Sequence, residues 1–229
     1  MDEREKIQAN NFYLVLAGLF IAALVTSNLI FQKFFSWNAF GIYTFEISAG
    51  IIPYPVTFLV TDIISELYGK KKANRVVMTG LFASVFTLFI VFVADLSTAT
   101  SWSPVTDGEF HHVFGVTYIG VGASMVAYLA AQFIDVQLFH FWKKLTKGKH
   151  LWLRNNASTF TSQFIDTFTV LFLLCSFGII EWTYFTSLLI NGFLFKIIVA
   201  LLDTPIIYFI VWQFKKYFGL KGAGAEIPL

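Results

Sequence analysis

Long runs of uncharged residues dominate this sequence and leave few folds open to it. Residues 12–31 form a run of twenty uncharged, mostly apolar residues, which is about the length at which a helix crosses the hydrocarbon core of a bilayer. The whole chain is 57% hydrophobic and 13% charged, whereas soluble domains are typically about 25% charged. The sequence therefore predicts an integral membrane protein of the all-α class, because helices satisfy their own backbone polar groups inside lipid.

Six segments are long and apolar enough to be predicted as transmembrane helices. They are residues 12–31, 47–67, 76–94, 116–141, 156–180 and 183–214. No polar stretch between them is long enough to fold separately, so residues 1–229 are predicted to form a single membrane domain. The first segment lacks a small-residue cleavage site after its apolar run, and we interpret it as a retained helix rather than a signal peptide.

The basic residues predict how these six segments are oriented. Fourteen of the sixteen Lys and Arg residues lie in the N-terminal segment, the second-to-third loop, the fourth-to-fifth loop and the C-terminal tail. Six spans place all four of these regions on one side of the membrane. Because cytoplasmic loops carry an excess of Lys and Arg, both termini are predicted to be cytoplasmic.

Five charged residues lie inside the predicted spans: Asp62, Asp135, Asp166, Asp203 and Lys196. A charge at the bilayer centre costs about 2.5–3.5 kcal/mol on insertion scales, so such residues are usually paired and functional. At about 1.5 Å of rise per residue, all five fall into one band of depth. Lys196 is the predicted internal counter-charge, and a purely structural ion pair with Asp166 is the alternative role.

A four-residue motif, Gln-Phe-Ile-Asp, occurs twice, at residues 132–135 and 163–166. Gln and Asp three positions apart share one face of a helix. The short basic loop between the fourth and fifth spans predicts antiparallel neighbours, so the two polar faces would meet inside the bundle. Transporters built from inverted repeats place their binding sites in this way. Chance similarity is the alternative, since only four residues are identical.

The second span begins with a segment that is unsuited to a helix, residues 48–55, which contains Gly50, Pro53 and Pro55. Proline removes a backbone donor and breaks the hydrogen-bond ladder. Non-helical backbone at membrane depth is tolerated where it is buried in protein or lines a wet cavity. This segment is therefore predicted to form a cavity wall, with Tyr54 and Glu46 near the mouth. The alternative is an ordinary interfacial turn.

Several of these polar residues have a structural alternative. Asp62 and Asp135 would then be helix-packing residues with access to cytoplasmic water, and Asp203 would serve a helix broken at the proline that follows. Asn28 is expected either to bond another helix or to line the site. Glu66 is expected to form a surface pair with the neighbouring lysines.

Other classes of protein leave recognisable motifs that this chain lacks. It has no phosphate-binding glycine loop, metal-binding His-Glu-x-x-His motif or nucleophile elbow, so no enzyme activity, metal, cofactor or nucleic-acid partner is predicted. Small residues recur at Ala123, Ala127 and Ala131. Such a stripe lets helices approach closely, either within the chain or in a homodimer.

The motifs described above resemble those of the queuosine precursor transporter family. The resemblance rests on Pro55 and Thr61-Asp62 followed by Ile-Ile-Ser-Glu-Leu-Tyr-Gly, on Gln132 to Asp135, on the sequence NNASTFTSQFID ending at Asp166, and on Lys196. It implies a six-span protein of the bacterial inner membrane, similar in plan to the substrate-binding subunits of energy-coupling-factor importers. It also implies uptake of 7-deazaguanine bases such as preQ0, preQ1 or queuine.

The expected ligand is flat, with a donor edge of amide and amine groups and a carbonyl acceptor. A carboxylate accepts two hydrogen bonds from such an edge, and a glutamine amide meets the carbonyl. The predicted substrate-binding residues are Asn28, Asp62, Gln132, Asp135, Gln163, Asp166 and Lys196.

The energy source of uptake stays open at this point. One hypothesis is that a buried aspartate exchanges protons during transport. The alternative to an independent transporter is a binding subunit that needs an external coupling ATPase.

Overall fold

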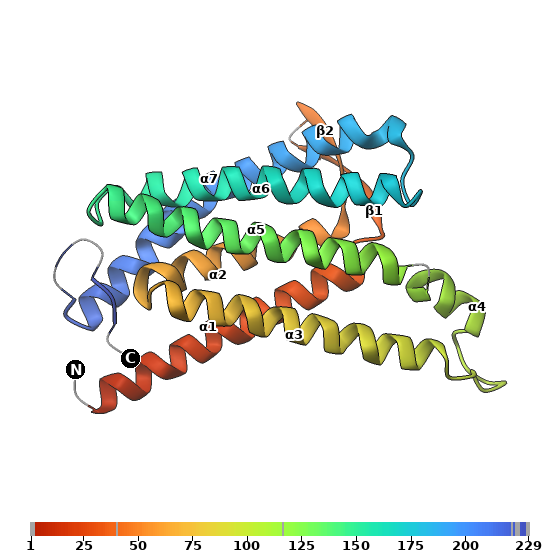
Figure 1. The fold of residues 1–229 in the computed structure, drawn as a ribbon, viewed down its shortest axis with the longest axis horizontal. Coiled ribbons are helices and arrows are strands. Elements are labelled where there is room, and N and C mark those ends of the chain that lie inside the picture. Colours follow the sequence, from red (N-terminus) through yellow and green to blue (C-terminus); the bar gives the residue numbers. More distant parts are fainter. Residues whose placement is uncertain (1–2, 40, 116, 221, 223–224, 228–229) are drawn as a thin grey trace.

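The computed structural model describes residues 3–39, 41–115, 117–220, 222 and 225–227, and it forms a bundle of long helices with one short hairpin (Figure 1). The side chains of residues 117, 119–121, 123–124, 128 and 154–155 also lie outside the description. The elements in chain order are α1 (Glu3–Ile30), β1 (Phe34–Ala39), β2 (Tyr43–Ser48), η1 (Ala49–Ile51), α2 (Tyr54–Leu67), α3 (Lys70–Asp95), α4 (Asp107–Phe110), η2 (His111–Gly115), α5 (Thr117–Leu145), α6 (Leu151–Ser176), η3 (Trp182–Tyr184) and α7 (Phe185–Tyr217).

Five helical segments among the described residues are long and apolar enough to cross a membrane. They are Glu3–Ile30, Ala49–Leu67, Lys70–Asp95, Leu151–Ser176 and Trp182–Tyr217. These segments correspond to five of the six predicted spans and confirm a mostly helical membrane protein. The remaining predicted span, residues 116–141, coincides with α5, which has 29 residues and lies partly outside the description. The number of six spans therefore stays a prediction.

Helices α5 and α6 lie side by side and run in opposite directions (Figure 1). This confirms that the fourth and fifth predicted spans are antiparallel neighbours. Ala127 and Ala131 of the small-residue stripe are buried within the chain, whereas the side chain of Ala123 lies outside the description. The described part of the stripe therefore packs inside the bundle and is not left free for a homodimer contact.

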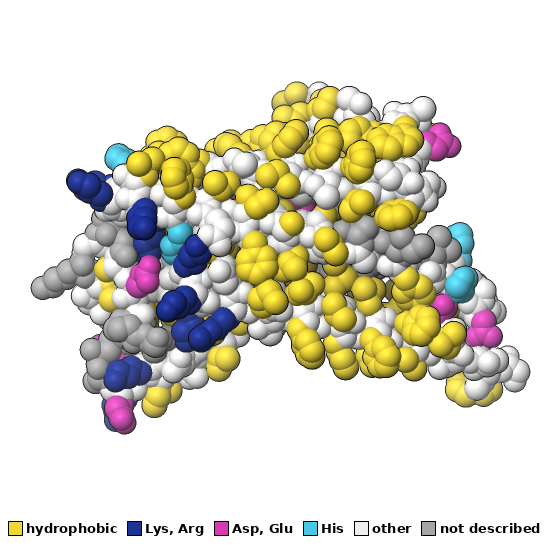
Figure 2. Space-filling model, in the orientation of Figure 1, with side chains coloured by type: hydrophobic (Ala, Val, Ile, Leu, Met, Phe, Trp, Pro, Cys, Tyr) yellow, Lys and Arg dark blue, Asp and Glu magenta, His cyan; other side chains and the backbone are white. Residues whose placement is uncertain are grey.

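The two ends of the bundle differ in charge. Figure 2 shows Lys and Arg side chains gathered at the end where both termini lie, which we call the basic end, and hydrophobic side chains over the middle of the bundle. On α3, Phe82, Phe86 and Phe89 are exposed, as expected for side chains that face lipid. This distribution is the one that cytoplasmic termini would produce.

A β-hairpin at the opposite end connects α1 to η1 and was not predicted. Its strands are antiparallel, with Phe34 opposite Ser48. An isolated two-stranded hairpin is marginally stable, but this one packs against α7. The Phe45 and Phe195 ring centroids are 6.0 Å apart, and the Tyr43 hydroxyl donates a hydrogen bond to Asn191 Oδ1 at 2.6 Å. We call this end of the bundle the hairpin end.

Between β2 and α2 the chain forms one 3-10 turn, η1, and a turn at residues 52–53 instead of an α-helix, in agreement with the helix-disfavouring Gly50 and prolines. The Gly50 N–H donates to Ser48 Oγ at 3.2 Å, and Ser27 Oγ of α1 donates to the Gly50 carbonyl at 2.6 Å. Pro55 lies in the first turn of α2, where a missing N–H costs little. Side chains therefore satisfy this irregular backbone, which lies against α1.

Helix α7 is continuous across Pro205, so the predicted break that Asp203 would serve is wrong. Neighbouring helices and Ser or Thr side chains allow proline within membrane helices. Here Asn156 Nδ2 of α6 donates to Thr204 Oγ1 at 2.9 Å, and Thr204 Oγ1 donates to the Ala200 carbonyl at 3.0 Å.

The expectation of a surface pair for Glu66 is also wrong. Glu66 is 1% exposed, and its carboxylate lies 2.6 Å from Lys215 Nζ and 3.7 Å from Lys143 Nζ. Lys143 also pairs with Glu226 at 2.9 Å, and the Ile227 N–H donates to the Leu67 carbonyl at 2.6 Å. Glu66 thus links α2, α5, α7 and the C-terminal residues at the basic end.

We expect Glu66→Gln to destabilise the bundle, because two lysines of low exposure lose the negative charge that they share. Loss of one partner from a buried polar pair costs about 1–3 kcal/mol, and more for charged groups. Thermal unfolding of the purified protein in detergent should show a lower midpoint than that of Glu181→Gln, a control at an exposed carboxylate. Equal midpoints for the two variants would contradict the structural role of Glu66.

Cysteine labelling tests the orientation in a Cys175→Ser background, in which the native thiol is absent. An impermeant maleimide applied to spheroplasts should label Gly108→Cys, because Gly108 is exposed near the hairpin end with free space around it. It should label Lys71→Cys, which lies at the basic end, only after permeabilisation. The reverse pattern would place the termini on the outside.

Candidate functional site

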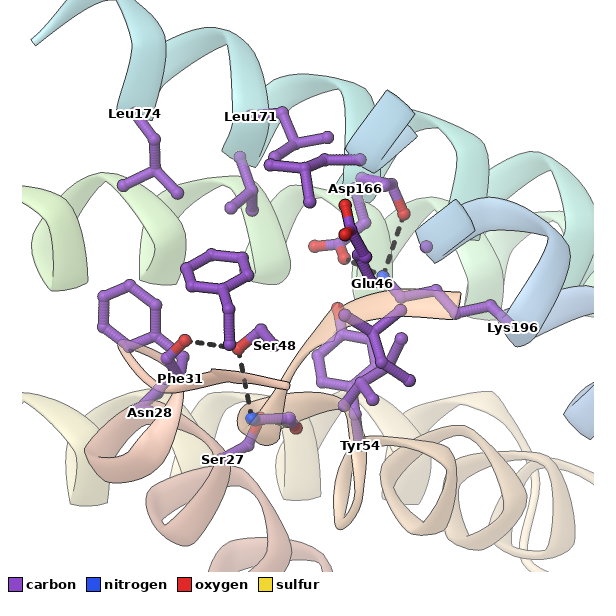
Figure 3. Close-up of a pocket in the computed structure, with 18 residues that line it drawn as sticks. Ser27, Asn28, Phe31, Glu46, Ser48, Tyr54, Asp166, Leu171, Leu174 and Lys196 are labelled. Carbon is purple, nitrogen blue, oxygen red and sulfur yellow. Dashed lines mark hydrogen bonds and ion pairs between the residues drawn. The ribbon is translucent and has the colours of Figure 1, made fainter. Parts of the chain in front are cut away.

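The principal cavity lies between α1, β2, η1, the start of α2, α6 and α7, and has a volume of about 140 Å³ (Figure 3). That size suits a small molecule rather than a peptide. Its floor is the irregular segment that follows β2. A Cβ atom on Gly50 would come within 2.8 Å of both Phe31 Cβ and the Ser27 carbonyl. Only glycine therefore allows this segment to lie so close to α1.

One wall of the cavity is a helical face of α6. Thr167, Val170, Leu171 and Leu174 stand at positions i, i+3, i+4 and i+7 and all line the cavity, so they lie on one side of the helix. Asp166 lies at the start of this face. The wall therefore changes from polar at Asp166 and Thr167 to apolar toward the hairpin end.

The strongest polar feature of the cavity is an ion pair between α6 and α7. Lys196 Nζ lies 2.8 Å from Asp166 Oδ2, and the two side chains are 10% and 4% exposed. The ammonium also donates to Thr167 Oγ1 at 2.9 Å and lies 4.3 Å from the centroid of the Tyr54 ring. Lys196 is thus held by a carboxylate, a hydroxyl and an aromatic face at once. Figure 3 shows Lys196 and Asp166 directed toward one another.

Two acceptor groups on the cavity have capacity left for a ligand. Asp166 Oδ1 is buried and accepts no hydrogen bond from the described residues, although its partner oxygen is engaged by Lys196. Glu46 of β2 also lines the cavity and is exposed. A buried acceptor without a donor is unfavourable, so the site is suited to a molecule that brings N–H groups to Asp166.

The principal cavity leads toward the hairpin end of the bundle. A second, larger space of about 650 Å³, the outer cavity, shares five lining residues with it: Phe31, Phe34, Glu46, Leu174 and Leu188. On the other side, Tyr54 and Lys196 separate the principal cavity from a small inner cavity of about 20 Å³. The site is therefore reached from the hairpin end and closed toward the basic end.

A second polar group surrounds the inner cavity, which Asp62, Thr159, Gln163 and Asp203 line. Asp62 also lies within hydrogen-bonding reach of Asp135 on α5. Ser162 Oγ donates to Asp135 Oδ1 at 2.9 Å, which connects α5 to α6. The two Gln-Phe-Ile-Asp motifs thus both point into the bundle, since all four of their Gln and Asp side chains are buried.

The structure divides the seven predicted binding residues among three places. Asn28, Asp166 and Lys196 line the principal cavity, whereas Asp62 and Gln163, together with Lys196, line the inner cavity. Gln132 and Asp135 are fully buried and line neither of these two cavities. Which of the seven residues touch a ligand stays a prediction.

Both alternatives for Asn28 have support in the structure. Asn28 lines the principal cavity, and its Nδ2 donates to Ser84 Oγ of α3 at 3.5 Å. Ser48, Tyr54 and Glu46 line the cavity as well, in agreement with the prediction that residues 48–55 form a cavity wall with Tyr54 and Glu46 near its mouth. Ser27 of α1 also lines the cavity and was not among the predicted site residues.

The part of the chain that the structure describes contains no group of three or more His, Cys, Asp or Glu side chains arranged to hold a metal ion. The groups on the cavity offer hydrogen bonding, charge pairing and contact with an aromatic ring.

Comparisons with known proteins agree with a transport role. Residues 48–210 match a family described as "putative vitamin uptake transporter". A Bacillus subtilis (strain 168) protein named "probable queuosine precursor transporter" is 29% identical over 196 residues, which cover 83% of this chain and 82% of the relative. A Haemophilus influenzae protein of the same name is 24% identical over 127 residues, which cover 55% and 51% of the two chains.

No solved structure matches the chain, so similarity in plan to energy-coupling-factor subunits stays a prediction. The family match, by contrast, spans more than half of the sequence, including η1, α2 and α3 and most of α5, α6 and α7. The chain therefore belongs to this vitamin uptake transporter family, whose members are membrane transporters and not enzymes.

Proposed function

We propose that this protein imports 7-deazaguanine precursors of queuosine, such as preQ0, preQ1 or queuine, across the bacterial inner membrane. The observation that carries the proposal is the Asp166–Lys196 ion pair, which lies beside the Tyr54 ring on a small cavity open toward the hairpin end. The names of the two relatives support this choice of substrate class.

The donor edge of the base would meet Asp166. The ring amide N–H and the exocyclic amine point in one direction, and a single carboxylate oxygen has two lone pairs with which to accept from both. Lys196 fixes one carboxylate oxygen and leaves Oδ1 for the ligand. Lys196 neutralises the charge of the Asp166 carboxylate from within the bundle, so the cavity itself stays free for the ligand.

The flat face of the base would lie against aromatic and apolar side chains. Tyr54 offers a ring on the α2 side, and Leu171 and Leu174 of α6 line the opposite wall. Aromatic contacts of this kind add about 0.5–1.5 kcal/mol beyond the burial of area. The apolar walls also exclude water, which strengthens the hydrogen bonds to Asp166.

Direction of transport follows from which end of the site is open. The principal cavity leads into the outer cavity and is closed toward the basic end. With cytoplasmic termini, this conformation would receive ligand from outside the cell. Glu46 lies at the junction of the two cavities, where its carboxylate would attract the donor edge or a cationic aminomethyl group.

Binding to the purified protein tests the role of the ion pair. We expect Asp166→Asn to raise the Kd for a 7-deazaguanine base at least tenfold, about 1.4 kcal/mol, because the variant loses the charged acceptor. Asp203→Asn serves as the matched control, since Asp203 lines the inner cavity and not the principal one. An unchanged Kd of Asp166→Asn for the base would contradict the proposed binding site.

Uptake into proteoliposomes that contain only this chain separates an independent transporter from a subunit that needs an external ATPase. We expect radiolabelled preQ0 or preQ1 to enter vesicles, and we expect the chain to restore queuosine in the tRNA of a strain that cannot synthesise the precursor. Tight binding without uptake by the chain alone would favour the ATPase-dependent alternative.

A further inference from the structure

A pair of buried carboxyl groups lies next to the ligand cavity without forming part of it. Asp62 of α2 and Asp135 of α5 are 2% and 0% exposed and lie within hydrogen-bonding reach of each other. Each has one oxygen that accepts a hydrogen bond from α6. Thr159 Oγ1 donates to Asp62 Oδ2 at 3.5 Å, and Ser162 Oγ donates to Asp135 Oδ1 at 2.9 Å.

The other oxygen of each group, Asp62 Oδ1 and Asp135 Oδ2, is buried and accepts no hydrogen bond from the described residues. Ser158 of α6 is a further hydrogen-bond partner of the Asp135 carboxyl group. Two ionised carboxylates offer only acceptors to one another, so a contact between them becomes favourable only when one of them carries a proton. A proton on either carboxyl would turn the contact between Asp62 and Asp135 into a hydrogen bond.

The described charged groups around the pair do not supply a cation. Helix α7 contributes Asp203, a third carboxylate whose charge repels that of Asp62. It also contributes Lys196, which donates hydrogen bonds to Asp166 and Thr167 of α6. On α2, Glu66 lies one turn away and pairs with Lys143 of α5 and Lys215 of α7. The buried residues of α1 and α3 are uncharged. Adjacent buried carboxylates repel one another, which favours a proton on one of them.

The geometry points to a binding site for one exchangeable proton at Asp62 and Asp135, separate from the ligand cavity, that couples ligand movement to a proton gradient. This inference rests on the proposed transport function for its role, whereas the shared proton itself follows from the two carboxyl groups alone.

Lys196 connects the proton site to the ligand site. Its side chain lines both the principal and the inner cavity, and Asp62 lines the inner cavity beside it. An ionised Asp62 would draw the Lys196 ammonium away from Asp166, whereas protonation of the pair leaves Lys196 on Asp166, where it holds that carboxylate in place for the N–H groups of the ligand. Proton and ligand therefore favour each other's binding, as uptake driven by an acidic exterior requires. By reciprocity, protonation of the pair and binding of the ligand change each other's affinity by the same factor.

Infrared spectroscopy of the purified protein in lipid detects the proton without any ligand. A protonated carboxylic acid has a carbonyl stretch that shifts on exchange into deuterium oxide. We expect part of this band to be lost in both Asp62→Asn and Asp135→Asn. Asp166→Asn should keep it, because Asp166 lies outside the carboxyl pair and contacts Lys196 at 2.8 Å. A band that is unchanged in both of the first two variants would overturn the proton site.

Proteoliposome transport tests the coupling. In the wild type, an acidic exterior should drive accumulation of the 7-deazaguanine base above its external concentration. Asp62→Asn and Asp135→Asn should bind the base within about twofold of the wild-type Kd and exchange labelled for unlabelled base across the membrane, yet lose accumulation driven by the gradient. Asparagine resembles the protonated acid in shape, so both variants should fold.

Two results would contradict the coupling: wild-type uptake that is indifferent to the pH gradient, or variants that still accumulate the base under it. Failure of the wild type to bind or exchange the base is a different result. It would reject the proposed function, whereas the infrared band would still decide whether Asp62 and Asp135 share a proton.

Discussion

Lys196 and Asp166 lie inside the bundle, where neither charge is solvated by bulk water, and their contact at 2.8 Å makes the rest of the site possible. Removal of one partner from a buried ion pair leaves an uncompensated charge and typically costs about 3–5 kcal/mol. The pair ties α6 to α7, and Tyr54 brings α2 to the same point. Three helices therefore meet at one polar centre, which leaves a single carboxylate oxygen for a ligand.

The polar layer inside the bundle is divided in two by Tyr54 and Lys196. Toward the hairpin end is a mostly apolar cavity with few polar groups, and toward the basic end Asp62 and Asp203 line a much smaller space. The principal and inner cavities are both lined by α2, α6 and α7 and share Lys196. A change of charge at one cavity therefore changes the electrostatic environment of the other. A transporter that moves a neutral or cationic base needs such a link if a proton gradient is to drive it.

Much of this arrangement could be predicted from the sequence, because opposite charges in apolar segments must pair and the combination of Gly50, Pro53 and Pro55 disfavours an α-helix. The Asp166–Lys196 pair and the irregular start of the second span follow from those constraints. The division into two cavities does not, since rise per residue gives depth but not the rotation of each helix about its axis. The hairpin and the burial of Glu66 depend on distant partners: Tyr43 bonds Asn191, 148 residues away, and Lys215 lies 149 residues from Glu66.

A double-mutant cycle on ligand affinity tests most directly whether Asp166 and Lys196 act as one unit in binding. The cycle compares the wild type, Asp166→Asn, Lys196→Met and the double variant by equilibrium binding of one 7-deazaguanine base. If Lys196 acts by holding Asp166, the double variant binds no more weakly than Asp166→Asn alone, and the two losses are strongly non-additive. Losses that add, or a double variant with wild-type affinity, would contradict a ligand site centred on this ion pair.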